Sequence, residues 1–414
     1  MNTSKNKDLI YAMKPFKILS WPLGTWPLQT YNLFALTRFV FAISVMLVVQ
    51  VILNSEMCLN PTDVEANLDA LMFSVVGTLA LSKVLSFRFY STKLIFNFVS
   101  AVKDYNELDE ENKRMIMRRH AYMSRVMCVA LIGIGNVCAW ILTALPILLK
   151  GDQEINVTVE DTITFPLPSK TVILLLNLPE NLYLLIFFVQ YLMMVIMVTG
   201  NLGNDLNSRV AKEITVKKVI LRLTSSDLVF FGIVFHLCGQ AEILKMQFTR
   251  LINDSGETTE NFPSLIKRHD YLLQLSKMLN DVISFVLVIQ LLASCVLIST
   301  CGFQFILALN TRNIIIVLKT LFILLTVLIQ LYSYSYMGDY LKSQMDGIGY
   351  SLYSCSWYSL PANVAKNIVL VILRAQIPVH LTAGKFFVVN LETFMSILKT
   401  SMSYLSILRV MITT

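Results

Sequence analysis

This sequence of 414 residues is poor in charge. Only 15% of its residues are Asp, Glu, Lys or Arg, whereas 55% are hydrophobic and the mean hydropathy is +0.63. So little charge excludes a soluble domain with an ordinary polar surface and indicates a polytopic membrane protein. The net charge of +7 is scattered over loops beside hydrophobic stretches, so we interpret it as a determinant of topology. We expect no nucleic acid partner.

The residues and motifs of catalysis and metal binding are also scarce. The four histidines are far apart and do not have metal-ligand spacing. Neither a G-x-x-x-x-G-K-[ST] phosphate loop nor a G-x-S-x-G elbow is present. The seven cysteines mostly lie in or near apolar segments, where we interpret them as small buried hydrophobes. We therefore expect no enzymatic activity, no cofactor, no metal site and no disulfide framework. The N-terminus has lysines but no apolar region of a cleavable signal peptide.

Long apolar stretches are what the sequence does have, and they predict an all-α membrane protein of seven transmembrane helices. Lys and Arg gather in the N-terminal tail and in the second and fourth loops, which predicts a cytoplasmic N-terminus and an extracellular C-terminus. The sequon at Asn156 lies in the third loop, on the outer side, and is a candidate glycosylation site. The predicted spans are Leu33–Leu53, Ala66–Phe87, Val126–Leu149, Tyr183–Leu202, Val282–Leu309, Ile314–Tyr336 and Phe386–Met411.

Two further segments are apolar, but we do not predict that they span the membrane. Leu228–Lys245 has too short an apolar core, and we interpret it as a cytoplasmic continuation of the fourth helix; an eighth span is the alternative. Ala362–Arg374 has the spacing of an amphipathic helix. The expected organisation is a cytoplasmic N-terminal segment (1–32), six spans with a ligand pocket and cytoplasmic loops (33–334), a cytoplasmic anchor region (335–385) and the last helix (386–411).

The last stretch has two different faces. Leucines recur every seven residues on one side, at Leu391, Leu398 and Leu405. A hydroxyl row follows a three-four spacing on the other side: Thr393, Ser396, Thr400 and Ser403, continued by Ile407 and Val410. A hydroxyl row that ends in apolar residues suits a water-filled pore with a hydrophobic gate. Close packing of helices in lipid explains the same small residues, so both interpretations stay open.

Charges within spans need protein or water around them. Lys399 lies near the middle of the last span, and we place it at a seam between subunits, near Glu392. Lys319 in the sixth span has no evident partner in the sequence, and Asp69 begins the second span.

The outer halves of several spans carry aromatic and apolar residues with few polar groups. Such a lining suits a small oily ligand, although ordinary packing explains each residue singly. The candidate ligand residues are Met72, Phe73 and Val76 in the second span, Asn136, Trp140 and Thr143 in the third, and Tyr183, Phe187 and Tyr191 in the fourth.

The C-terminal part of the chain resembles the insect odorant receptor family. The resemblance is carried by Tyr336–Leu341, Trp357, Arg374–Pro378, Leu381–Phe387 and Leu398–Tyr404, together with His236–Leu244 and His269. It is similar in style to the receptors of ants, bees and wasps. The resemblance implies a tuning subunit of an odorant-gated, non-selective cation channel in the plasma membrane of olfactory sensory neurons. Such subunits form heterotetramers with a shared co-receptor in the membrane lipid and bind small hydrophobic odorants or pheromones.

The same resemblance assigns roles within the last helix. Thr400 and Ser403 are expected to line the pore, and Ile407, Val410 and Met411 to form its narrow outer gate. One departure from the family pattern is an extra segment near residues 207–228, between the two parts of the fourth helix. The chain does not look like the co-receptor, whose loop between the fourth and fifth spans is much longer.

Other membrane receptors are the alternatives. A gustatory-type receptor channel is the nearest, but its typical end, Thr-Tyr followed by Gln-Phe, is absent. A G-protein-coupled chemoreceptor would have an acidic-Arg-aromatic triplet after the third span and N-P-x-x-Y in the seventh; neither is present. A secondary transporter would show internal repeats, and none is visible.

Overall fold

The computed structural model describes most of the chain. Its described residues are 8, 11–12, 33–59, 61–150, 169, 172, 182, 185–186, 188–191, 193, 226–253, 258–354 and 356–413. Within helices, a few of these residues have a described backbone but no described side chain.

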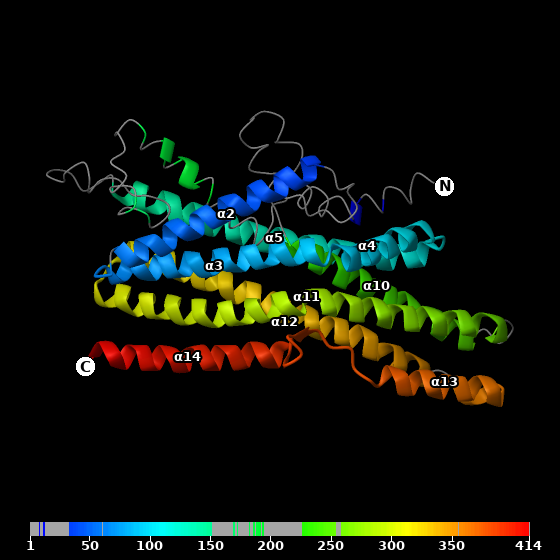
Figure 1. The fold of residues 1–414 in the computed structure, drawn as a ribbon. Helices are drawn as coiled ribbons and strands as arrows, with labels where there is room; N and C mark the ends of the chain where they lie inside the picture. Colours follow the sequence, from blue (N-terminus) through cyan, green and yellow to red (C-terminus); the bar gives the residue numbers. More distant parts are fainter. Residues whose placement is uncertain are drawn as a thin grey trace.

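The described residues are almost entirely helical, which confirms the all-α membrane fold predicted from the sequence. The helices run side by side along one long axis, and α14 lies along one half of the molecule (Figure 1). The elements are α2 (Leu33–Leu59), α3 (Val64–Phe89), α4 (Ser91–Asn106), α5 (Glu111–Lys150), α10 (Ser226–Asn253), α11 (Thr258–Asn310), α12 (Ile314–Tyr353), the short 3-10 helix η2 (Trp357–Ser359), α13 (Ala362–Ala375), β1 (Thr382–Ala383), β2 (Phe387–Val388) and α14 (Leu391–Thr413).

Five segments among the described residues are long and apolar enough to cross a membrane, and each overlaps a predicted span. They are Leu36–Leu59, Val64–Ser86, Glu111–Cys138, Phe262–Asn310 and Ile314–Tyr353. The predicted fourth span, Tyr183–Leu202, lies mostly outside the described residues. The protein is therefore a multi-pass membrane protein, and the count of seven spans and their orientation stay predictions.

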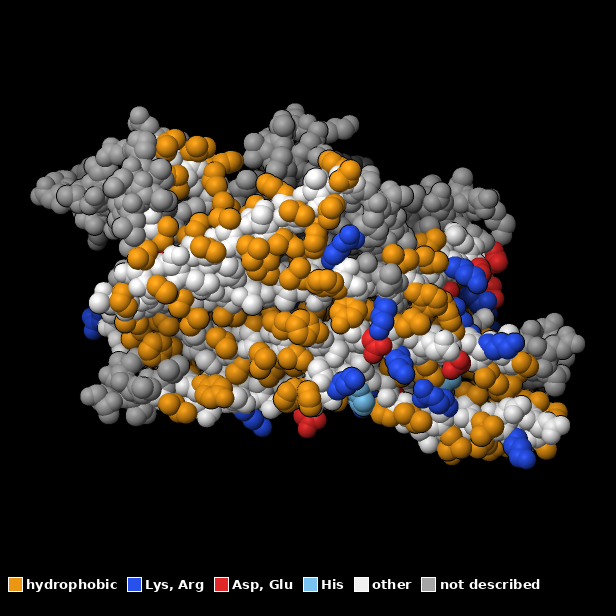
Figure 2. All heavy atoms as spheres, in the orientation of Figure 1, with side chains coloured by type: hydrophobic (Ala, Val, Ile, Leu, Met, Phe, Trp, Pro, Cys, Tyr) orange, Lys and Arg blue, Asp and Glu red, His pale blue; other side chains and the backbone are white. Residues whose placement is uncertain are grey.

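The longest helices extend well beyond a bilayer. Helix α11 has 53 residues and α12 has 40. At about 1.5 Å per residue they measure roughly 80 Å and 60 Å, against about 30 Å for the hydrocarbon core. Hydrophobic side chains cover most of one half of the visible face, whereas charged side chains gather over the half that holds α4 and α13 (Figure 2). That charged half stands outside the hydrocarbon.

The predicted sixth span, Ile314–Tyr336, is the first part of a longer helix, because α12 continues without a break to Tyr353. Buried side chains continue along this helix past the expected end, at Met337, Leu341, Met345 and Ile348. Their three-four spacing packs one face of α12 into the main hydrophobic core, so protein contacts extend the helix where lipid contacts end.

Helix α10 contains the apolar segment that the sequence assigned to a cytoplasmic continuation of the fourth helix. It packs against α5, α11 and α12, and its residues from Phe230 to Ala241 are almost all buried. The segment is apolar because protein surrounds it. The junction with the fourth span, including the extra segment at 207–228, lies outside the described residues.

The amphipathic helix predicted at Ala362–Arg374 is confirmed as α13. Val364, Ile368 and Val371 are buried against α12, whereas Leu370 and Leu373 are exposed on the opposite face.

The sequence predicted that the last helix begins at Phe386. In the structure it begins at Leu391. The residues before it form a hairpin, in which β1 and β2 pair antiparallel around a turn with Gly384 and Lys385 at positive φ. Thr382 N donates to Asn280 Oδ1 at 2.7 Å, and Gly384 N donates to Ser284 Oγ at 2.9 Å, which ties the hairpin to α11. These contacts hold an apolar segment in extended form that hydropathy alone assigns to a helix.

Two side chains fix the start of α14. Asn390 Oδ1 accepts a hydrogen bond from Thr393 N at 2.8 Å, as a helix N-cap does. Asp339 Oδ2, on α12, accepts one from Leu391 N at 2.9 Å. The N-terminal end of the pore-helix candidate is therefore attached to both long helices, α11 and α12.

Candidate functional site

The two faces of α14 differ in burial over the second half of the helix, whereas near its start Leu391 is exposed and Thr393 is half-buried. Leu398 and Leu405 are half-buried, whereas Thr400, Ser403 and Ile407 are exposed in the single chain. Ser401, between the faces, is buried against Cys295 of α11. The remaining gate candidates, Val410 and Met411, belong to α14, but their side chains are not among those described. What the hydroxyl row faces stays a prediction.

Two exposed hydroxyl groups of α14 donate hydrogen bonds to backbone carbonyl oxygens of the same helix. Thr400 Oγ1 donates to Ser396 O at 2.9 Å, and Ser406 Oγ donates to Met402 O at 3.0 Å. Such internal bonds let a polar row face either lipid or water at little cost. Lys399 and Glu392 are also exposed on this helix, which is compatible with the predicted place of Lys399 at a seam between subunits.

The predicted ligand residues are only partly within the described structure. Met72 is buried in the main core, and its Sδ lies 3.2 Å from Cys301 Sγ of α11. The half-buried candidates are Phe73, Val76, Asn136 and Tyr191. Trp140 and Thr143 lie on α5 with side chains that are not described, and Tyr183, Phe187 and the glycosylation candidate Asn156 lie outside the described residues. The ligand assignment stays a prediction.

Directly beside Met72, the structure contains a charged pair that sequence reasoning missed. Lys319 of α12 donates to Asp69 Oδ2 of α3, and Gln304 Nε2 of α11 donates to Asp69 Oδ1 at 2.9 Å. Both charged side chains are about one-sixth exposed, at 15% and 16%. A signal was present in the sequence, because two opposite charges each occur near one end of an apolar span.

The C-terminal part of α11 contacts both this charged pair and the pore-helix candidate. Gln304 contacts α3, and two residues earlier Gly302 faces α14. A Cβ on Gly302 would lie 2.9 Å from Leu405 Cδ2, so the two helices approach closely at that point. Leu405 is two residues from the gate candidate Ile407. One turn of α11 therefore contacts α3 through Gln304 and α14 through Gly302.

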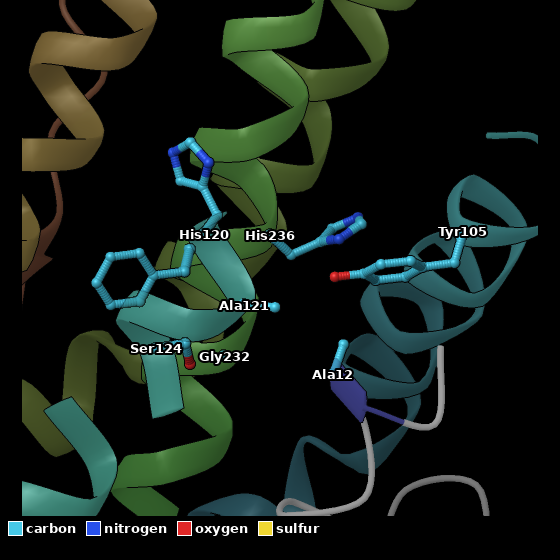
Figure 3. Close-up of a pocket in the computed structure, with 8 residues that line it drawn as sticks. Ala12, Tyr105, His120, Ala121, Ser124, Gly232 and His236 are labelled. Carbon is cyan, nitrogen blue, oxygen red and sulfur yellow. The ribbon is translucent and has the colours of Figure 1, made fainter. Parts of the chain in front are cut away.

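A second polar cluster lies in the charged half of the molecule, around a cavity of about 20 Å³ (Figure 3). That volume holds about one water molecule. Tyr105 from α4 points towards His236 from α10, and their ring centroids are 5.7 Å apart. The lining residues are Ala12, Tyr105, His120, Ala121, Ser124, Gly232, Phe235 and His236.

The histidines of this cluster are structural hydrogen-bonding groups. His236 Nε2 lies 3.0 Å from Asp104 Oδ2, and Arg268 donates to Asp104 Oδ1 at 2.6 Å. His120 Nε2 lies 3.1 Å from Tyr340 Oη. These bonds join α4, α10 and α11, and α5 to α12, in the interior of the bundle. The sequence showed these residues as isolated, because their partners are more than 100 positions away.

The carboxylate at the centre of this network stays ionised. Burial alone raises the pKa of Asp104, but the hydrogen bonds and charges of His236 and Arg268 outweigh burial, and the net effect lowers its pKa below the ordinary 3.8. A lowered folded-state pKa means that ionised Asp104 stabilises the fold above pH 3.8, and that this stabilisation is lost as the pH falls through the folded-state pKa.

We expect Asp104→Asn to destabilise the protein at pH 7 by about 1–3 kcal/mol, because the charge-assisted bonds from Arg268 and His236 are weakened. The measurement is thermal unfolding in detergent at pH 7 and again below pH 3.8, where wild type and variant should converge. Asp281→Asn is the control: its exposed pair with Lys93 should contribute less than about 1 kcal/mol. Equal effects of the two variants at pH 7 would contradict the assignment.

The family described as 7tm odorant receptor matches residues 214–402. Odorant receptor 13a of Drosophila melanogaster is 28% identical over 210 residues, 46% of this chain and 50% of that receptor. Odorant receptor 10 of Aedes albopictus is 27% identical over 147 residues, 35% of this chain and 38% of that receptor. The matched regions thus span half the length of these relatives or less. The relatives are receptors, which supports a non-enzymatic protein at the level of the family.

Solved structures extend the likeness over the whole fold. The insect olfactory receptor OR5 from Machilis hrabei superposes with a TM-score of 0.70 over 96% of both chains, at 16% identity. The same receptor in complex with eugenol also gives 0.70, over 99% of this chain and 98% of that one. At this identity the match concerns the fold. The sequence matches in the C-terminal region are also to odorant receptors, so this chain is similar to insect odorant receptors both in sequence and in fold.

Proposed function

We propose that this protein is a tuning odorant receptor, a subunit of a ligand-gated, non-selective cation channel that opens together with a co-receptor. Its ligands are small, volatile, hydrophobic odorants or pheromones, and its place is the plasma membrane of olfactory sensory neurons. The family match and the eugenol complex of the Machilis hrabei receptor support odorant binding.

One observation carries the channel part of the proposal: the exposed hydroxyl row of α14, which ends at Ile407. The opposite face of the helix packs on α11, so the row is left for a partner subunit, lipid or water. One helix cannot enclose a pore, so a pore requires several copies of α14 around one axis. A tetramer with the co-receptor provides four.

Co-expression with an insect odorant co-receptor under voltage clamp, against an odorant panel, tests this function. We expect odorant-evoked cation current that requires both subunits and persists when G-protein signalling is blocked. Current that depends on a G protein and not on the co-receptor would reject the channel in favour of a G-protein-coupled chemoreceptor. Responses to tastants without the co-receptor would favour the gustatory type.

The gate assignment makes a separate prediction. Ile407→Ser, with Val410→Ser as a second variant, should raise the current without odorant several-fold, because a polar ring lowers the cost of wetting a hydrophobic constriction. Basal current normalised to surface protein measures the effect. Met402→Ser is the matched control, since Met402 is equally exposed, at 58% against 57%, but lies on a different side of α14. Unchanged leak in both gate variants argues against the gate.

A further inference from the structure

The polar group beside the candidate ligand residues has an unused hydrogen-bonding capacity. Gln304 is 1% exposed, and its Oε1 accepts no hydrogen bond from any described residue. A buried, unpaired carbonyl oxygen costs about 1–3 kcal/mol, so an arrangement that keeps one calls for an explanation. Gln304 Nε2 is occupied by Asp69, which fixes the direction of the amide.

The neighbouring lysine offers the complementary capacity. An ammonium carries three N–H donors, and among the described residues Lys319 uses only the one directed at Asp69. Both oxygens of Asp69 are occupied, one by Lys319 and one by Gln304. Asp69 therefore holds a donor group, the ammonium of Lys319, and an acceptor group, the amide of Gln304, one at each of its oxygens.

The place of this group relates it to the predicted ligand residues. On α3, Asp69 precedes Met72, Phe73 and Val76 by three, four and seven residues, so all four lie on one stripe of the helix. On α11, Gln304 follows Cys301, which contacts Met72, by three residues. The polar group thus ends the otherwise apolar candidate site.

From this geometry we infer that the receptor recognises odorants with a hydroxyl group, alcohols or phenols, by this polar end of its site. The hydroxyl hydrogen is donated to Gln304 Oε1, and the hydroxyl oxygen accepts from Lys319 Nζ. A carbonyl or ether oxygen accepts from Lys319 but leaves Gln304 unpaired, and a carboxylate competes with Asp69. The inference rests on the proposed function and specifies the ligand class of that same site.

The same contacts give the hydroxyl a route to the pore helix. Gln304 lies two residues after Gly302 on α11, and the close approach of Gly302 to Leu405 brings α11 into contact with α14. An odorant bound to Gln304 therefore acts on the helix that contacts the outer end of α14.

The test uses matched compounds on the full receptor, co-expressed with a co-receptor under voltage clamp. The probes are 1-octanol, citronellol and 2-phenylethanol, each with its methyl ether and its parent hydrocarbon. For the skeletons that activate the channel, we expect the alcohol to act at about tenfold lower concentration than the ether. In Gln304→Met this ratio, measured within the variant and normalised to its own surface protein, should fall to near one.

Gln290→Met is the matched control. Gln290 lies on the same helix, is 2% exposed and also has an unpaired Oε1, but it is about 21 Å away along the helix axis. The alcohol preference should survive in this variant. If wild type does not prefer alcohols to ethers, or the preference persists in Gln304→Met, a bound water and not a ligand satisfies Gln304, and the inference is overturned. No current with any probe, from receptor present at the surface, counts against the proposed function itself.

Discussion

Lys319→Met is expected to destabilise the protein by about 3 kcal/mol, since it leaves the carboxylate of Asp69 without its ammonium partner inside the helix bundle. The pair joins α3 to α12, with Gln304 of α11 as a third member, so the loss should loosen three helices at once. The fraction of protein at the cell surface and the melting temperature in detergent measure this effect, independently of any odorant.

The double variant Asp69→Asn/Lys319→Met makes the prediction specific. Removing both charges should recover most of the loss, with a coupling energy of about 1–3 kcal/mol between the two sites. Lys93→Met is the control, because its pair with Asp281 is nearly half exposed and should contribute under about 1 kcal/mol. A double variant that is no more stable than Lys319→Met would refute the pairing.

Gly338→Ala should also destabilise the protein, because α12 and the segment leading into α14 meet at this glycine. A Cβ there would lie 1.9 Å from Val389 O and 3.0 Å from Val389 C, which are backbone atoms. The neighbouring Asp339 and the hairpin hold that backbone in place, so it cannot easily move away. Overpacking of this kind typically costs about 1–3 kcal/mol.

The attachment of α14 is the part that this substitution should disturb. We expect Gly338→Ala to reduce surface protein, and to abolish or prolong the evoked current in the channels that remain. Gly133→Ala is the matched control on α5, since nothing lies within 4 Å of its added Cβ, and it should behave like wild type. If both variants behave alike, the contact at Gly338 does not constrain the pore helix.

The sequence predicts well those features that depend on whether a segment is surrounded by lipid, water or protein. A span must be apolar over its whole length because lipid cannot hydrogen-bond to polar groups, so the five described membrane segments follow from hydropathy. The helix Ala362–Ala375 follows from its three-four spacing, because one face meets protein and the other does not. The two faces of α14 are recognisable for the same reason.

Prediction from the sequence fails where contacts between segments that are far apart in the chain determine the local structure. Phe386–Val389 is apolar and adjoins a helix, so hydropathy extends that helix to Phe386. In the structure the segment pairs with β1, and Asn280 and Ser284 of α11 hold that strand and the turn in place. In the same way the sequence shows where α12 leaves the bilayer but not that its helix continues to Tyr353. The packing of that extension on α10 is not visible in its own residues.

The sequence by itself determined the membrane class, the apolar spans and the hydroxyl row of the last helix, because each depends on neighbours within a few turns. The tertiary structure alone decided that Asp69 and Lys319 pair, that Gln304 keeps a free acceptor beside them, and that α14 is held at Gly338. Asp69 and Lys319 are separated by 250 positions, and local spacing carries no information about contacts at that separation. Only the packing of α3, α11 and α12 brings them together.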